Sequence, residues 1–143
     1  MFRNSLITGV TASLFGTIVS VAYISIFKYS ALEADFSEHA TIPYLLGINA
    51  LFGMLNCLLY FGMIKLFKND NLIDFINGFL LSAFVIAFSL SLMFKVDANL
   101  TFKNENAELS KDYFFFILAP VPFFSVLSWF TFKPLFLKNK SNF

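Results

Sequence analysis

The sequence predicts an all-α integral membrane protein, an antiparallel up-down bundle of four transmembrane helices, and two observations support this prediction. Charged residues make up 13% of the 143-residue chain and hydrophobic residues 58%, whereas soluble domains carry about 25% and 45–50%. The apolar residues are also gathered into four runs that are long enough to cross a bilayer, which takes about 20 residues. The length fits one compact domain over residues 1–143.

The four predicted spans cover residues 5–27, 42–64, 75–94 and 113–132, and none of them contains Asp, Glu, Lys, Arg or His. All charged side chains and the single histidine fall in segments 28–41, 65–74 and 95–112 or near the two ends. A charge at the bilayer centre costs roughly 2.5–3.5 kcal/mol, so insertion into lipid selects for this segregation. Asn71 and Asp74 resemble a capping box at the start of the third span.

The basic residues are distributed unevenly between the two sides of this predicted bundle. The N-terminus, the 65–74 link and the tail hold six of them: Arg3, Lys65, Lys68, Lys133, Lys138 and Lys140. The other two loops hold four: Lys28, Lys95, Lys103 and Lys111. Because Lys and Arg collect on the cytoplasmic side, we expect both termini and the link to be cytoplasmic and loops 28–41 and 95–112 to be outside. The composition, without a cysteine pair, fits a bacterial inner (cytoplasmic) membrane.

The start of the chain allows a second interpretation. Arg3, the apolar stretch after it and the small residues Ser20 and Ala22 resemble a secretory signal peptide with its cleavage site. However, the apolar run continues to Phe27, and the basic region before it is a single arginine. We therefore expect this segment to be retained as the first span.

No acidic, basic or imidazole side chain lies inside the predicted spans, and this excludes several classes of function. Proton-coupled exchange of the kind used by small multidrug exporters requires a carboxylate in the membrane. Intramembrane hydrolysis requires a base beside its nucleophile. The sequence also has no Gly-rich phosphate loop and no His/Cys metal spacing. We expect no cofactor and no nucleic-acid partner, and the lipid bilayer is the first partner predicted.

Small and polar residues form stripes along three of the spans. The second span carries Asn49, Gly53, Asn56 and Tyr60 at i, i+4, i+7 and i+11. The first carries Gly9, Gly16, Ser20 and Tyr23, and the third carries Gly78, Ser82 and Ser89. Small residues let helix backbones approach, and Asn or Ser can bond across. We expect packing faces here, within the chain, between copies or with a membrane partner, and the alternative is the lining of a pore.

Two prolines interrupt the fourth span. Pro120 and Pro122 have no N–H group, so the carbonyls of Phe116 and Leu118 lose their donors at i+4. An unpaired carbonyl in hydrocarbon costs several kcal/mol unless another helix, a hydroxyl or a water satisfies it. We expect a kinked helix and a partner for these carbonyls.

Depth indicates where the partner lies. At about 1.5 Å of rise per residue, the two carbonyls fall within ~10 Å of the outer boundary, and polar residues of the other spans share this layer. The candidate site is this layer together with one residue further along the second-span stripe: Ser20, Asn49, Asn56, Ser89, Pro120 and Pro122. Our hypothesis is that the Asn49 amide, or a water that it holds, donates to the freed carbonyls. The alternative is that serine side chains or local 3₁₀ turns satisfy them.

Outside the spans, the first loop offers a second, weaker candidate. Asp35, Glu38 and His39 are spaced i, i+3 and i+4, and two carboxylates with an imidazole can begin a metal site. The remaining ligand would come from the other outer loop, from Asp97 or Glu105. The alternative is a solvated acidic connector, and we expect no metal.

These observations lead to three functional interpretations. The first is a non-enzymatic structural, accessory or assembly component of the membrane, oligomeric through the small-residue stripes. The second is a small channel or uniporter for a neutral or weakly charged solute, with a pathway along Asn49 and Asn56. The third is a membrane enzyme that uses the Asp, Glu and His side chains of the outer loops on a lipid or envelope substrate.

Overall fold

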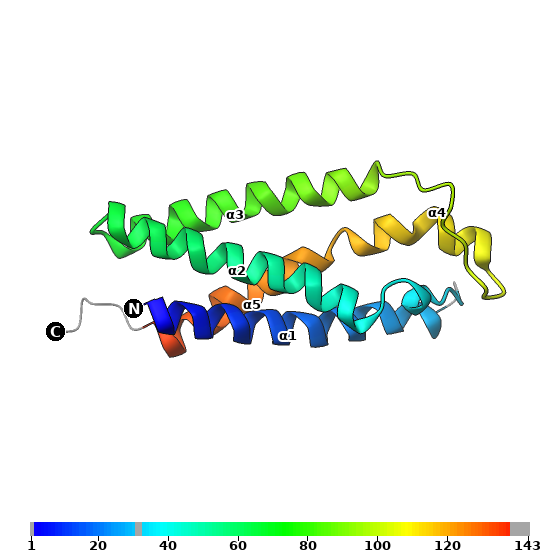
Figure 1. Cartoon of the computed structure of the whole chain (residues 1–143), viewed down its shortest axis with the longest axis horizontal. Coiled ribbons are helices and arrows are strands. Elements are labelled where there is room, and N and C mark those ends of the chain that lie inside the picture. The colour runs from blue at the N-terminus through cyan, green and yellow to red at the C-terminus, as the bar shows by residue number, and fades with distance from the viewer. Residues whose placement is uncertain (1, 31–32, 138–143) are drawn as a thin grey trace.

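The computed structural model describes residues 2–30 and 33–137. Within these ranges the chain forms five α-helices and one short 3₁₀ helix, without a β-strand. The elements are α1 (Phe2–Lys28), η1 (Phe36–Glu38), α2 (Ile42–Leu66), α3 (Asp70–Met93), α4 (Ala107–Leu118) and α5 (Val121–Phe136). The predicted all-α antiparallel bundle is confirmed, and its helices run roughly parallel to the long axis in Figure 1.

Helices α4 and α5 together make one span that is broken between Leu118 and Val121. With α1, α2 and α3, this gives four segments in the described part of the chain that are long and apolar enough to cross a membrane. The predicted kink in the last span is confirmed, and Pro120 is the N-cap residue of α5. The last span starts at Ala107, earlier than predicted, because its polar first turns precede the apolar run.

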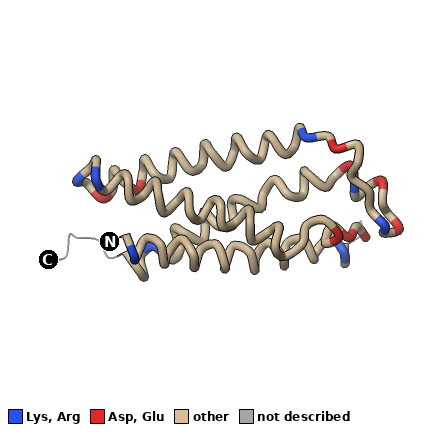
Figure 2. The backbone as a smooth tube through the Cα atoms, viewed as in Figure 1, with Lys and Arg blue, Asp and Glu red and all other residues tan. Residues whose placement is uncertain are grey.

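Charged residues lie at the two ends of the bundle and leave the middle uncharged, as Figure 2 shows. One end, which we call the termini end, holds the start of α1, the α2–α3 link and the end of α5. The other, the loop end, holds the α1–α2 and α3–α4 connections. Lys138 and Lys140, which contributed to the predicted orientation, lie outside the described residues.

Helix α1 makes backbone-to-backbone contact with both of its main neighbours, because small residues lie at the crossings. A Cβ built on Gly53 of α2 would lie 2.7 Å from the Gly9 carbonyl oxygen of α1. A Cβ built on Gly16 would lie 2.9 Å from the backbone nitrogen of Ser125 in α5. Small residues allow such close approach between helices in lipid. The stripes of α1 and α2 are therefore packing faces inside one chain at these glycines.

Helix α3 is more peripheral, and it contacts α2, α4 and α5. Its predicted small-residue stripe does not form one packing face, because Ser89 is buried, Gly78 is half-buried and Ser82 is exposed. Its first turn also differs from the prediction. The Asn69 side chain caps the helix by accepting hydrogen bonds from the backbone N–H groups of Asn71 and Leu72, so the Asn71–Asp74 capping box was wrong.

Candidate functional site

The structure places Asn49 at the crossing of α1 and α2, where its side chain is fully buried. The amide nitrogen of Asn49 donates to the Ser20 hydroxyl at 2.9 Å and to the Leu45 carbonyl at 2.9 Å. Ser20 in turn donates to the Gly16 carbonyl at 2.6 Å. Both amide hydrogens of Asn49 are thus used, so the hypothesis that this amide donates directly to the carbonyls freed by the prolines was wrong.

Backbone carbonyls at the break in the last span accept hydrogen bonds from neighbouring backbone N–H groups and from a side chain of α3. The backbone N–H of Ala119 donates to the Phe116 carbonyl at 3.3 Å, in a 3₁₀-type turn, and that of Phe123 donates to the Pro120 carbonyl at 3.0 Å. The Ser89 hydroxyl of α3 donates to the Ala119 carbonyl at 2.6 Å. The local 3₁₀ turn of the alternative explanation is thus observed for the Phe116 carbonyl, whereas the serine side chain bonds the neighbouring Ala119 carbonyl. The predicted layer therefore divides into an Asn49–Ser20 pair and a Ser89–Ala119 pair.

We predict that Ser89→Ala destabilises the protein by about 1–3 kcal/mol, because it leaves the buried Ala119 carbonyl without its donor. The measurement is unfolding in detergent followed by circular dichroism. Ser91→Ala is the matched control on the same helix, since Ser91 is exposed and bonds only to the Phe88 carbonyl of its own turn. Equal stabilities of the two variants would contradict the role of Ser89 at the break.

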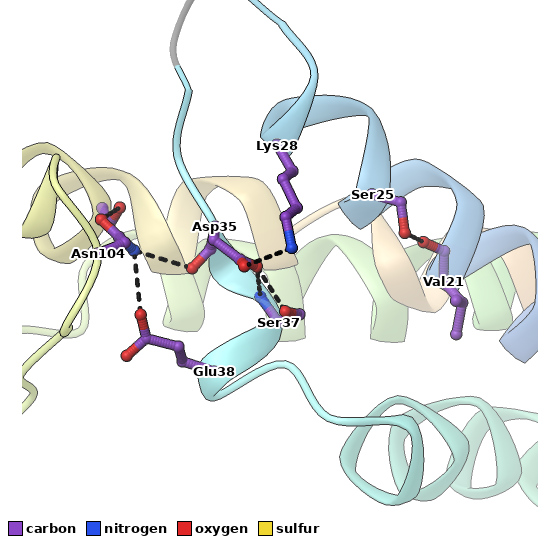
Figure 3. A network of polar contacts seen from close by, with 8 residues as sticks. Val21, Ser25, Lys28, Asp35, Ser37, Glu38 and Asn104 are labelled. Atoms are coloured by element: carbon purple, nitrogen blue, oxygen red, sulfur yellow. Dashed lines mark hydrogen bonds and ion pairs between the residues drawn. The ribbon is translucent and has the colours of Figure 1, made fainter.

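The three candidate metal ligands of the first loop bind other partners at the loop end. Asp35 pairs with Lys28 at 3.1 Å and accepts from the Ser37 backbone and hydroxyl, and Glu38 accepts from the Asn104 amide (Figure 3). His39 Nε2 lies 2.6 Å from the Thr101 carbonyl oxygen.

Over residues 2–30 and 33–137, no three His, Cys, Asp or Glu side chains converge as a metal site would require. Instead, these contacts join the two long loops. Glu38 accepts a second hydrogen bond from the Lys103 backbone at 2.8 Å, and the Asn104 amide also donates to the Asp35 carbonyl. The Ser37 hydroxyl, with help from Lys28, lowers the pKa of the Asp35 carboxyl, so Asp35 keeps its charge in this network. The arrangement is typical of a structural connector.

The termini end contains a polar group that the sequence analysis missed. The Lys133 side chain of α5 is only 8% exposed, and its ammonium donates to the Asp74 carboxylate of α3. The same ammonium lies 4.9 Å from the centre of the Tyr60 ring of α2. The Tyr60 and Trp129 rings meet edge to face at 5.9 Å. One charged layer therefore connects α2, α3 and α5.

A second layer of polar side chains lies one helical turn further into the bundle. Asn56 precedes Tyr60 by four residues on α2, Asn77 follows Asp74 by three on α3, and Trp129 precedes Lys133 by four on α5. Since α3 runs opposite to α2 and α5, each of these steps leads away from the termini end. We call the two layers together the termini-side polar cluster: Asn56, Tyr60, Asp74, Asn77, Trp129 and Lys133.

Three residues of this cluster are at most 1% exposed: Asn56, Asn77 and Trp129. Among the described residues, neither amide atom of the two asparagines nor the indole nitrogen of Trp129 has a hydrogen-bond partner. Of the six predicted site residues, only Asn56 belongs to this cluster. The helical spacing of Asp74 to Asn77 and of Trp129 to Lys133 was the available signal, but the charged members lay just outside the charge-free runs.

Comparison of the chain with protein-family models, with curated proteins and with solved structures finds no match. The geometry of the chain itself therefore has to support any proposal about function.

Proposed function

We propose that this chain is a structural or accessory component of a bacterial inner membrane, without a catalytic centre of its own and with both termini cytoplasmic. The observation that supports this role most is the close packing of α1 on α2 and α5 at Gly9, Gly53 and Gly16. Contacts between backbones fix the relative positions of helices, as a scaffold requires. A transporter with alternating access instead needs one group of helices to move against another.

The basic residues support the proposed orientation. Six of the ten Lys and Arg residues of the sequence belong to the N-terminus, the α2–α3 link and the C-terminal segment, and four belong to the two loops of the other end. Lys and Arg favour the cytoplasmic side. Labelling of single cysteines introduced at Lys68 and Glu105 in intact cells, in a Cys57→Ser background, tests this topology.

A small channel for a neutral or weakly charged solute is the second candidate, and one observation favours it. Asn56 lies fully buried along the predicted stripe with both amide atoms unpaired. Such a side chain would interact with a polar solute that passes through the bundle. Tyr60 follows it toward the termini end, so the stripe leads in the direction a pathway would take.

Solute flux in proteoliposomes separates the two candidates. For a structural component we expect water, glycerol, urea and K⁺ to enter at the rates of protein-free vesicles. A channel would raise one of these rates, and Asn56→Leu would lower it severalfold while the exposed control Asn71→Leu would not. Flux with that dependence on Asn56 would overturn the structural role. Complementation of a deletion strain by the triple Asp35→Ala, Glu38→Ala, His39→Ala variant would count against an enzyme at the loop end.

A further inference from the structure

The inner layer of the termini-side polar cluster concentrates unpaired hydrogen-bonding groups at one depth. Asn56 and Asn77 each contribute two N–H donors and one carbonyl acceptor, and the Trp129 indole contributes a donor. All three residues are at most 1% exposed. Away from water, groups of this kind are normally paired with protein or with ordered water, so several of them together indicate a bound ligand.

The neighbours of these three side chains bring α2, α3 and α5 together at this depth. Asp74 of α3, one turn from Asn77, pairs with Lys133 of α5, and a Cβ built on Gly78 of α3 would lie 3.5 Å from the Phe130 ring of α5. Tyr60, one turn from Asn56, contacts Trp129 directly. Asn56, Asn77 and Trp129 therefore lie buried at the depth where these three helices meet.

The kinds of unpaired atom select the chemical class of the ligand. An anion would satisfy the N–H groups and leave both asparagine carbonyl oxygens unpaired. A cation would satisfy the oxygens and leave five N–H groups unpaired. A small neutral molecule that both donates and accepts satisfies both kinds, and water is the smallest such molecule.

We infer that Asn56, Asn77 and Trp129 hold a cluster of bound water inside the membrane-spanning bundle, which opens toward the termini end alone. The way in passes Asp74, whose side chain is 39% exposed, and then Lys133. The next layer toward the loop end is apolar and closed, since Phe52, Leu81 and Val126 are each at most 6% exposed. This inference goes beyond the proposed structural role and does not depend on it.

The sequence supplies a specific reporter, because Trp129 is the single tryptophan of the chain. The full-length protein labelled with ¹⁵N-tryptophan gives one indole N–H signal in micelles or nanodiscs. We expect a direct cross peak between this N–H and water, and loss of the signal after transfer to D₂O. An indole signal without a water cross peak that persists in D₂O would overturn the inference.

Variants test whether the asparagines hold the water. Asn56→Leu and Asn77→Leu should weaken the water cross peak severalfold and leave the melting temperature equal or lower. Asn49→Leu is the matched control: it removes the bond to Ser20 but should keep the cross peak, because Asn49 lies two turns away on α2. Unchanged cross peaks in both test variants would overturn the inference. Raised melting temperatures in both would also overturn it, because the protein gains stability when a buried amide that has neither a protein partner nor water is replaced by an apolar side chain. If a variant does not fold, the signal of the wild-type protein still decides.

Discussion

Gly53→Ala is expected to destabilise the protein by about 3 kcal/mol, near the upper end of what overpacking costs in a well-packed core. The added methyl would lie 2.7 Å from the Gly9 carbonyl oxygen and would also meet the Ser13 hydroxyl. Ser13 can rotate, but the Gly9 carbonyl is helix backbone, so α1 and α2 have to separate. That separation would also weaken the contact of α1 with Ser125 of α5, at Gly16. Reversible unfolding in mixed micelles measures the change.

Two other glycines of the same helix provide the controls. A Cβ at Gly47 or Gly62 meets nothing within 4 Å, so Gly47→Ala and Gly62→Ala should be neutral or should stabilise by up to about 1 kcal/mol, because alanine favours the helix. Destabilisation of these controls as large as that of Gly53→Ala would show that the crossing of α1 and α2 is not the cause.

The sequence was sufficient to predict the helices, because their apolar runs and flanking charges are local properties. The kink was predictable for the same reason, since Pro120 removes a backbone donor wherever the helix packs. The partner of Asn49 was not predictable from depth. Depth follows from counting residues, but the rotation of α2 about its own axis follows from packing, and that rotation points Asn49 at Ser20.

The termini-side polar cluster was missed for a related reason. The charge-free run of the last span ends at Phe132, and Lys133 was taken as a residue of the tail. In the structure α5 continues to Phe136, so Lys133 stays on the face that carries Trp129 and reaches Asp74. A lysine can bury its apolar stem and direct its ammonium toward the end of the bundle, which composition alone does not show.

The Lys133–Asp74 pair is expected to respond asymmetrically to removal of its two partners. Asp74→Ala leaves an ammonium whose side chain is 8% exposed without its counter-ion. Such a loss costs about 3–5 kcal/mol in a fully buried pair, and the partial exposure of Asp74 reduces our expectation to about 2 kcal/mol. Lys133→Met removes the buried charge and leaves a carboxylate that is 39% exposed, so its cost should be about 1 kcal/mol or less.

The double variant tests this explanation, because removing both charges also removes the uncompensated one. Asp74→Ala combined with Lys133→Met should be more stable than Asp74→Ala alone, by about 1 kcal/mol in unfolding measurements at neutral pH. Asp70→Ala, an acidic residue in the first turn of the same helix, should cost less than about 1 kcal/mol, the usual value of a charge at a helix N-terminus. Additive effects of the two single changes would contradict a coupled pair. Additivity would mean that water, and not Asp74, stabilises the charge of the Lys133 ammonium.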